Sequence, residues 1–404
     1  MSQDISHVAG GVTAPKGFLA AGISCGIKKS GNKDLALVFS TAPARAGALF
    51  TTNKVKAAPV LVTKEHLKGG KAQAVVINSG NANCCTGKLG LADASEMANL
   101  VGIALNISAN DVLVASTGLI GILLPMRKVE AGISEAAVML NSKGGSAAAK
   151  AIMTTDTFLK ETAVQFRIGG KTIKMGGMAK GSGMIAPNLA TMLSVVTTDA
   201  RVEAGALLEA FKEAVNTSFN LITVDGDMST NDTVIIMANG LAENKEINED
   251  VLGREVFSEA LKHVTKELAE LIIRDGEGAT KFITIEVKGA ESFSDAKEAA
   301  MTVANSNLVK CAFFGGDPNW GRIMAAIGNS KVKVKPENID IYFGDEPMVM
   351  AGTGVVYCAQ TVEEMLKSRE IKVTIDLNLG VEKAVVWTTD LTHDYVRLNA
   401  EYKT

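Results

Sequence analysis

The chain has 404 residues and a formal net charge of −3, so it has no general attraction for nucleic acid or an anionic membrane surface. Its length exceeds the usual size of one hydrophobic core, which predicts two domains or lobes. No apolar run approaches the length of a membrane span, and the first residues lack the basic and apolar segments of a secretory signal. We therefore expect a cytoplasmic protein with no membrane or nucleic-acid partner.

The cysteines and histidines indicate neither disulfides nor a metal site. The five cysteines are odd in number and scattered, which argues against a disulfide framework. The four histidines stand alone in the sequence, without the HExxH spacing or another paired arrangement. Metal catalysis is therefore not expected.

The first part of the chain predicts short strands, tight turns and helices. Apolar and turn patterns favour two strands broken at Ala42-Pro43, a strand that enters an Asn/Gly turn (72–87), a helix (94–106), a buried strand ending in Thr-Gly (111–121), and a second helix (127–141). Two alternating runs around Gly169-Gly170 then predict a hairpin.

The second part predicts a similar mixture of elements. The expected strands cover residues 191–200, 232–240, 282–289, 371–379 and 383–391, and the expected helices cover 202–219, 255–274 and 295–314. Strands and helices alternate without a regular βαβ repeat, and hairpins are common. We therefore predict an α+β fold with mixed sheets and flanking helices, in preference to a doubly wound parallel sheet.

A glycine-rich loop leads into a strand-like run at Thr191, in the stretch GGMAKGSGMIAPNLATMLSVVTTDA (176–200). The residues alone leave two interpretations open. Thr191 starts a strand, because β-branched residues suit strands. Alternatively, Thr191 is a nucleophile whose own α-amine is the base, which requires cleavage of the bond between Ala190 and Thr191.

Four further motifs are ambiguous when each is taken alone. Thr117-Gly118 ends a predicted strand and forms either a common turn or an oxyanion hole. The hydroxyl cluster 154–157 suits a turn, and Lys180 either faces water or binds a small carboxylate. Glu277, between two glycines, belongs either to a helix C-cap turn or to a site for a ligand ammonium group.

Together these stretches resemble the ornithine acetyltransferase family, the glutamate N-acetyltransferases of arginine biosynthesis. The resemblance covers essentially the whole chain and rests on MAKGSGMIAPNLATML, STGLIG, TTDT, DGEGATK, NSGNAN, GGDPNWGR and LNAEY. The LATM junction and DGEGATK are its most specific parts. One departure is Cys84, where a small residue is expected before Cys85, and it affects no catalytic position.

The resemblance implies that the chain cuts itself after Ala190. This would leave an α chain (1–190) and a β chain (191–404) that form one intertwined unit, with a smaller C-terminal lobe. The fold would be a layered α+β sandwich similar to that of self-processing aminopeptidases. The implied assembly is a heterotetramer of two α and two β chains.

The resemblance also implies the reaction and its residues. Thr191 would take the acetyl group of N²-acetylornithine and pass it to glutamate, with Thr117 and Gly118 as the oxyanion hole. The substrate-contacting positions would be Thr154, Lys180, Thr191, Glu277, Asn399 and Thr404. Asn399 and Thr404 lie at the C-terminus, which would have to fold back over the site. No cofactor or metal is required, although bifunctional members also accept acetyl-CoA as a substrate.

Two other functions remain as alternatives. The first is a self-processing N-terminal-threonine aminopeptidase or amidase, in which water replaces glutamate as the acceptor. It would release acetate without forming acetylglutamate. The second is a non-enzymatic module that binds acetylated amino acids, for which we expect an uncut chain and no acetyl adduct.

Overall fold

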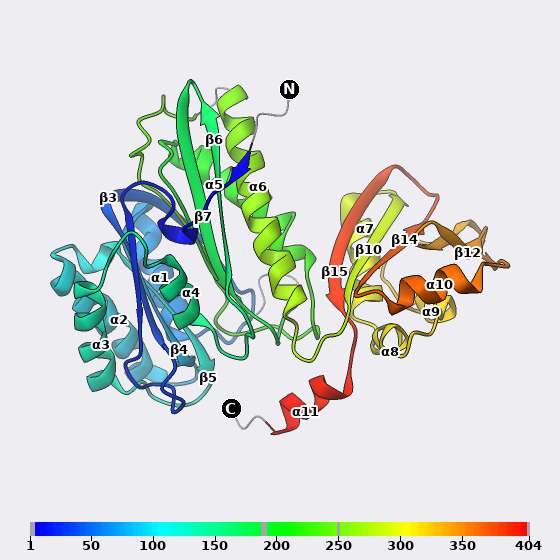
Figure 1. Ribbon diagram of the computed structural model, residues 1–404, viewed down its shortest axis with the longest axis horizontal. Coiled ribbons are helices and arrows are strands. Elements are labelled where there is room, and N and C mark those ends of the chain that lie inside the picture. The colour runs from blue at the N-terminus through cyan, green and yellow to red at the C-terminus, as the bar shows by residue number, and fades with distance from the viewer. Residues whose placement is uncertain (1–4, 187–191, 249–250, 402–404) are drawn as a thin grey trace.

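The computed structural model describes residues 5–186, 192–248 and 251–401, and its strands form two sheets covered by helices (Figure 1). Antiparallel pairs dominate, and parallel pairs such as β4 with β5 and β8 with β9 are interspersed. The predicted α+β class with mixed sheets is therefore confirmed. Within the described ranges, no helix combines the length and the apolar character needed to cross a membrane.

The first sheet has nine strands in the order β1-β6-β7-β8-β9-β3-β4-β5, with β2 paired to β3. These strands are β1 (Ser6–His7), β2 (Phe18–Ile23), β3 (Leu35–Phe50), β4 (Lys71–Asn81), β5 (Val112–Leu119), β6 (Lys160–Ile168), β7 (Lys171–Lys180), β8 (Leu193–Thr198) and β9 (Thr233–Ala238). The accompanying helices are α1 (Ala58–His66), α2 (Gly87–Leu105), α3 (Met126–Val138), α4 (Gly145–Ile152), α5 (Ala204–Asn216) and α6 (Val251–Arg274).

Helices cover both faces of this sheet because strand residues alternate between two cores. Val195 of β8 packs in the core that contains α4, whereas its neighbour Val196 packs in the core that contains α5 and α6. A third core lies between β2–β5 and the helices α1, α2 and α3. The site residues on these strands are therefore held by elements that are packed from both sides.

Strand β3 differs from the prediction of two strands broken at Ala42-Pro43. It runs unbroken over 16 residues, because the register with β4 shifts between Phe39 and Ala44. Such a bulge accommodates Pro43, which has no N–H to donate to the ladder. The predicted hairpin around Gly169-Gly170 is confirmed, since β6 and β7 pair antiparallel and both glycines have positive φ.

The second sheet has six strands in the order β13-β12-β11-β14-β10-β15. They are β10 (Phe282–Ala290), β11 (Asp340–Phe343), β12 (Glu346–Met350), β13 (Thr353–Gly354), β14 (Glu370–Asp376) and β15 (Glu382–Thr389). The helices of this lobe are α7 (Phe293–Ala304), α8 (Asn307–Gly315), α9 (Trp320–Gly328) and α10 (Ala359–Lys367), and α11 (His393–Glu401) follows β15. The single helix predicted over 295–314 is divided, because Ser306 caps a new helix by accepting the N–H of Val309.

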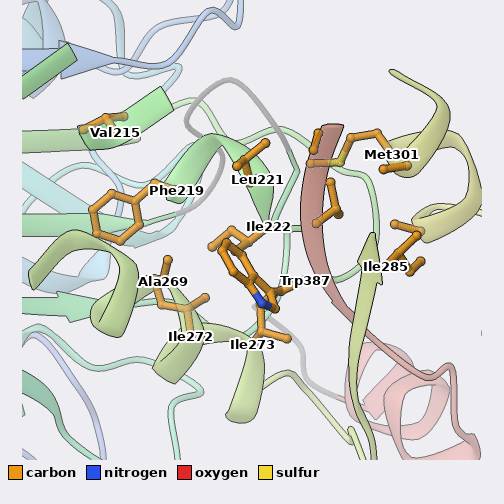
Figure 2. Close-up of a cluster of buried hydrophobic side chains, with 14 of the residues drawn as sticks. Val215, Phe219, Leu221, Ile222, Ala269, Ile272, Ile273, Ile285, Met301 and Trp387 are labelled. Atoms are coloured by element: carbon orange, nitrogen blue, oxygen red, sulfur yellow. The ribbon is translucent and has the colours of Figure 1, made fainter. Parts of the chain in front are cut away.

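One continuous core joins the two lobes. The Trp387 ring of β15 lies among Leu221, Ile222, Ile272 and Ile273, which come from α6 and from the segment that follows α5 (Figure 2). The backbone reinforces this contact, since Thr223 N–H donates to Trp387 O at 3.0 Å. The C-terminal α11 extends from the smaller lobe toward the larger one (Figure 1).

Candidate active site

Three of the predicted site residues, Ala190, Thr191 and Thr404, lie outside the described residues. The chain that follows Thr191 is nevertheless fixed on one acidic side chain. Met192 N–H donates to Asp232 Oδ1 at 2.8 Å, and Met192 O accepts the N–H of Thr233 at 3.2 Å. These bonds continue the parallel pairing of β8 with β9, so Met192 lies at the start of a buried strand pair.

The residue before Asp232 reaches the predicted oxyanion hole. The Asn231 side-chain amide donates to Ser116 O at 2.8 Å and to Ala82 O at 2.6 Å. Ser116 directly precedes Thr117 on β5. The Asn231-Asp232 dipeptide therefore brings the end of β5 and the start of β8 together at one point.

Gly118 occupies a backbone position that excludes every other residue. Its φ is 131°, and a Cβ atom there would lie 2.3 Å from the carbonyl carbon of Gly80 on the paired strand β4. Glycine is therefore required both by the backbone conformation and by the close approach of β4. Thr117 beside it is buried. The Thr117-Gly118 pair is thus held rigidly at the strand end.

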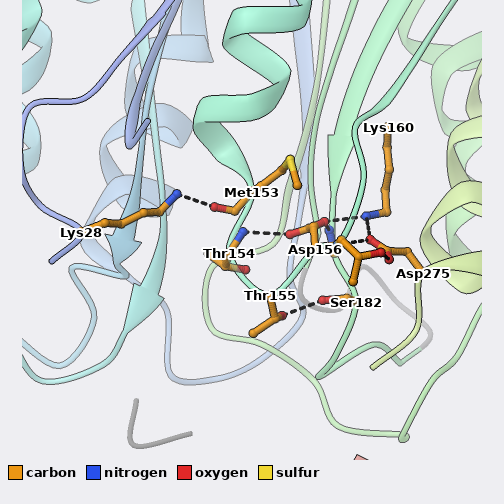
Figure 3. Close-up of polar contacts among 10 residues, drawn as sticks. Lys28, Met153, Thr154, Thr155, Asp156, Lys160, Ser182 and Asp275 are labelled. Atoms are coloured by element: carbon orange, nitrogen blue, oxygen red, sulfur yellow. Dashed lines mark hydrogen bonds and ion pairs between the residues drawn. The ribbon is translucent and has the colours of Figure 1, made fainter. Parts of the chain in front are cut away.

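A buried ionic cluster lies beside Thr154 (Figure 3), and its member Asp156 interacts with the Lys180 charge. Lys160 Nζ donates to Asp156 Oδ1 at 2.7 Å and to Asp275 Oδ2 at 2.5 Å. Asp156 Oδ1 also accepts Gly181 N–H, and its Oδ2 accepts Thr154 N–H, both at 2.8 Å. Asp156 therefore connects the loop that carries Thr154 to the end of β7, where Lys180 lies.

The charges of this cluster set the protonation states of its members. Burial alone would raise the pKa of Asp156, but the Lys180 and Lys160 ammonium groups and the Gly181 N–H outweigh it and lower that pKa. Burial lowers the pKa of Lys180, against the opposing attraction of Asp156. The Lys180 ammonium has no hydrogen-bond partner within the described ranges. A ligand carboxylate would supply one and favour the charged lysine.

Burial has the opposite effect on the acidic Asp232. It raises the pKa of this carboxyl well above the ordinary value, although Met192 N–H and the Lys180 charge oppose the shift. Asp232 Oδ2 is buried and has no hydrogen-bond partner in the described part of the chain. A buried acid with one unpaired oxygen therefore holds the amide of Met192.

Glu277 and Asn399 meet, as the predicted return of the C-terminus requires. Asn399 Nδ2 of α11 donates to Glu277 Oε2 at 2.9 Å. The Glu277 N–H donates to Ser182 O at 2.8 Å, two residues after Lys180. Gly183 also lies against the Glu277 carboxylate, since a Cβ atom at Gly183 would come within 2.4 Å of it. A carboxylate is thereby presented next to the loop that leads to Thr191.

Two of the histidines that stand alone in the sequence meet in the structure. His7 Nε2 and His263 Nε2 lie 3.3 Å apart, and both rings approach Glu267. Both histidines are exposed and Glu267 is half-buried, and the three residues lie on β1 and α6. No hydrogen bond or ion pair joins them to the described site residues. It is the one group of potential metal ligands found within the described residues.

The structure adds residues that sequence reasoning missed. They are Asn231 and Asp232 before β9 and the ionic cluster of Asp156, Lys160 and Asp275. In the sequence, Asp156 stands out only as the single carboxylate among the hydroxyls of TTDT. The others gave no local signal, because Lys160 and Asp275 are 115 residues apart in the sequence.

Known proteins resemble this chain along its whole length. Residues 19–404 match the ArgJ family. The arginine biosynthesis bifunctional protein ArgJ of Caldanaerobacter subterraneus subsp. tengcongensis is 52% identical over 399 residues, 98% of this chain and 99% of that protein. That of Symbiobacterium thermophilum has the same identity and the same coverage. Ornithine acetyltransferase from Mycobacterium tuberculosis, solved with ornithine, is 46% identical, covers 46% of this chain and 98% of that chain, and has a TM-score of 0.42.

Proposed function

The chain belongs to the ArgJ family, and from this membership we propose how its own residues carry out the activity. It is an acetyltransferase of arginine biosynthesis that moves the acetyl group of N²-acetylornithine to glutamate. Like its bifunctional relatives, it also uses acetyl-CoA as a donor of the acetyl group. The products of the first reaction are ornithine and N-acetylglutamate.

The observation that carries the assignment of the site is the double contact of Asn231 and Asp232. The Asn231 side chain donates to the carbonyl of Ser116, which precedes Thr117. The Asp232 side chain accepts the N–H of Met192, which follows Thr191 in the sequence. These contacts support the proposal that a nucleophile at Thr191 acts together with an oxyanion hole at Thr117-Gly118. Acyl transfer requires this pairing of groups.

The first half-reaction transfers the acetyl group to the protein. The Thr191 hydroxyl attacks the acetyl carbonyl of acetylornithine, and its proton passes to the α-amine of Thr191 that self-cleavage has freed. Thr117 and Gly118 hold the oxyanion. The carbon–nitrogen bond then breaks, and the ornithine amine leaves with the proton, so that an acetyl ester remains on Thr191.

The second half-reaction reverses these steps with a different amine. The α-amine of glutamate attacks the ester, the carbon–oxygen bond breaks, and the Thr191 oxygen regains its proton. Lys180 receives the α-carboxylate that both amino acids share, and Thr154 and Asn399 line the same pocket. Glu277 offers its carboxylate to the ornithine ammonium group. The acetyl group travels on the protein, so no metal or cofactor takes part.

The two fragments stay together after cleavage. Strand β7 precedes the cut, and its residues 175–180 pair with β8, which follows the cut. Strand β9 likewise pairs with β3. These hydrogen bonds support an αβ unit, and we place two such units in a cytoplasmic heterotetramer.

The test is a coupled assay with acetylornithine and glutamate. The proposal predicts equal amounts of ornithine and acetylglutamate, and a Thr117→Val variant should lose roughly 2.7–4 kcal/mol of transition-state stabilisation, because one oxyanion donor is removed. Acetate released without acetylglutamate would instead identify a hydrolase.

A further inference from the structure

Lys28 is a lysine near the predicted site that the acetyl-transfer steps do not use. It lies in the loop between β2 and β3, and its side chain is half-buried. Its aliphatic stem packs over Gly80, since a Cβ atom at Gly80 would lie 3.0 Å from Lys28 Cγ. Gly80 is the strand partner of Gly118. Lys28 therefore covers the outside of the oxyanion strand pair.

The ammonium group of Lys28 points toward the loop that carries Thr154 (Figure 3). Its Nζ donates to Met153 O at 2.6 Å and to Lys33 O at 2.8 Å. An ammonium group has three hydrogens, and no third acceptor is found among the described residues. One N–H is therefore available beside Thr154.

The backbone of the loop fixes this orientation. The buried Asp34 carboxylate accepts the N–H of Cys25 at 2.7 Å and that of Lys28 at 2.9 Å. Both oxygens of Asp34 are thus engaged by backbone N–H groups. Within the part of the chain that the structure describes, the Lys28 ammonium has no direct carboxylate partner.

The two amino-acid substrates differ in the charged group at the end of the side chain. Ornithine carries a side-chain ammonium, which Glu277 can receive, whereas glutamate carries a second carboxylate, which needs a cation. Lys180 is already assigned to the shared α-carboxylate. Lys160 is committed to Asp156 and Asp275. The buried Lys310, whose charge interacts with Asp225, donates its hydrogens to Thr388 and Thr389. Among these four described lysines, Lys28 is the one left for a second carboxylate.

We propose that Lys28 binds the side-chain carboxylate of the acceptor glutamate and so selects the acidic amino acid for the second half-reaction. This inference rests on the function proposed above. It assigns the side-chain carboxylate of glutamate to Lys28, which is not among the substrate-contacting positions that the family resemblance implies.

The electrostatic surroundings of Lys28 fit this role. Burial lowers its pKa to about 8, aided by the Lys180 charge and opposed by Asp34 and Asp156. Lys28 consequently loses its charge as the pH rises through about 8. The KM for glutamate should then increase above that pH, whereas a Lys28→Arg variant, which stays charged, should show no such rise.

The test is steady-state kinetics of the full-length, self-processed protein. In Lys28→Met the KM for glutamate should rise roughly 10-fold or more relative to the KM for acetylornithine, because a charge-assisted hydrogen bond is lost. Lys28→Arg should restore most of the difference. Lys29→Met is the matched control, since Lys29 is the exposed neighbour on the same loop.

The outcomes separate the two proposals. Equal increases of both KM values would overturn the inference, since Lys28 would then merely hold the Thr154 loop in place. Unchanged values would also overturn it. If the unsubstituted protein transfers no acetyl group from acetylornithine, the proposed function itself fails, independently of Lys28.

Discussion

At the scale of single residues, Asp232 combines two properties that rarely coincide. One of its oxygens holds the amide that follows the predicted cleavage bond, and the other is buried without a partner in the described residues. Burial raises the pKa of this carboxyl well above the ordinary value, which favours its protonated form. A protonated carboxyl can donate as well as accept a hydrogen bond next to the reacting groups.

Replacing this acid should therefore slow both steps that involve Thr191. In Asp232→Asn we expect self-cleavage and acetyl transfer to slow by ~10-fold or more, because an amide cannot supply the carboxyl proton at that position. Gel time courses of the uncut chain and initial rates of ornithine release measure the two effects. Asp227→Asn, an exposed acid of the same loop, should behave like the unchanged protein. Equal rates in both variants would exclude a role for Asp232.

The motifs predicted some site residues but not the residues that position them. Gly118 and Glu277 stand in short signatures that are visible in the sequence, and the structure places each beside a close backbone or side-chain neighbour. Asp232 stands in no such signature. Its function depends on a hydrogen bond to Met192, 40 residues away, which local patterns cannot specify.

At the scale of elements, α11 connects the smaller lobe to the loops around the proposed site. Asn399 bonds Glu277, Thr392 Oγ1 donates to Gly278 O at 2.7 Å, and Tyr395 Oη donates to Asp225 Oδ2 at 3.1 Å. Asp225 in turn accepts the N–H of Met184 and Ile185. The helix is thus tied to the loop that leads toward Thr191.

Loss of the Asn399 amide should weaken substrate binding more than it weakens folding. For Asn399→Ala we expect the KM for acetylornithine to rise by ~2–10-fold, the effect of one exposed hydrogen bond, with little change in thermal stability. Steady-state kinetics and a melting curve provide the measurement, and Glu401→Ala on the same helix is the control. An unchanged KM would show that α11 does not contribute to the pocket.

The elements that the sequence predicted correctly have local causes. Gly169-Gly170 supplies two residues with positive φ, which a tight hairpin between β6 and β7 needs. The unbroken β3 was not predictable, because Pro43 is accommodated only by a bulge against β4. The end of α7 was missed for a related reason, since the polar Asn305-Ser306 step carries too little signal within an otherwise helical run.

At the scale of the whole molecule, the buried cluster of Asp156, Lys160 and Asp275 makes stability depend on pH. The pKa of Asp156 is lowered below its ordinary 3.8, so its contribution to stability is fully present above that value and is lost as the pH falls further. Removing the charge by Asp156→Asn should cost about 3–5 kcal/mol at neutral pH, because buried Lys160 loses a partner.

The difference in unfolding free energy between Asp156→Asn and the unchanged protein should shrink as the pH falls below about 4. The unchanged protein then starts to lose the same charge. Urea unfolding of both proteins between neutral and acidic pH measures the difference in unfolding free energy. A difference that stays constant across this range would contradict the assigned direction of the Asp156 pKa.

The most direct test of the account is the intact mass of the purified protein before and after incubation with N²-acetylornithine alone. We predict two fragments, 1–190 and 191–404, and an added acetyl group on Thr191 of the second fragment, which glutamate then removes. Thr191→Ala should remain a single unmodified chain. An uncut protein, or an acetyl group on another residue, would contradict the assignment of Thr191 as the self-freed nucleophile.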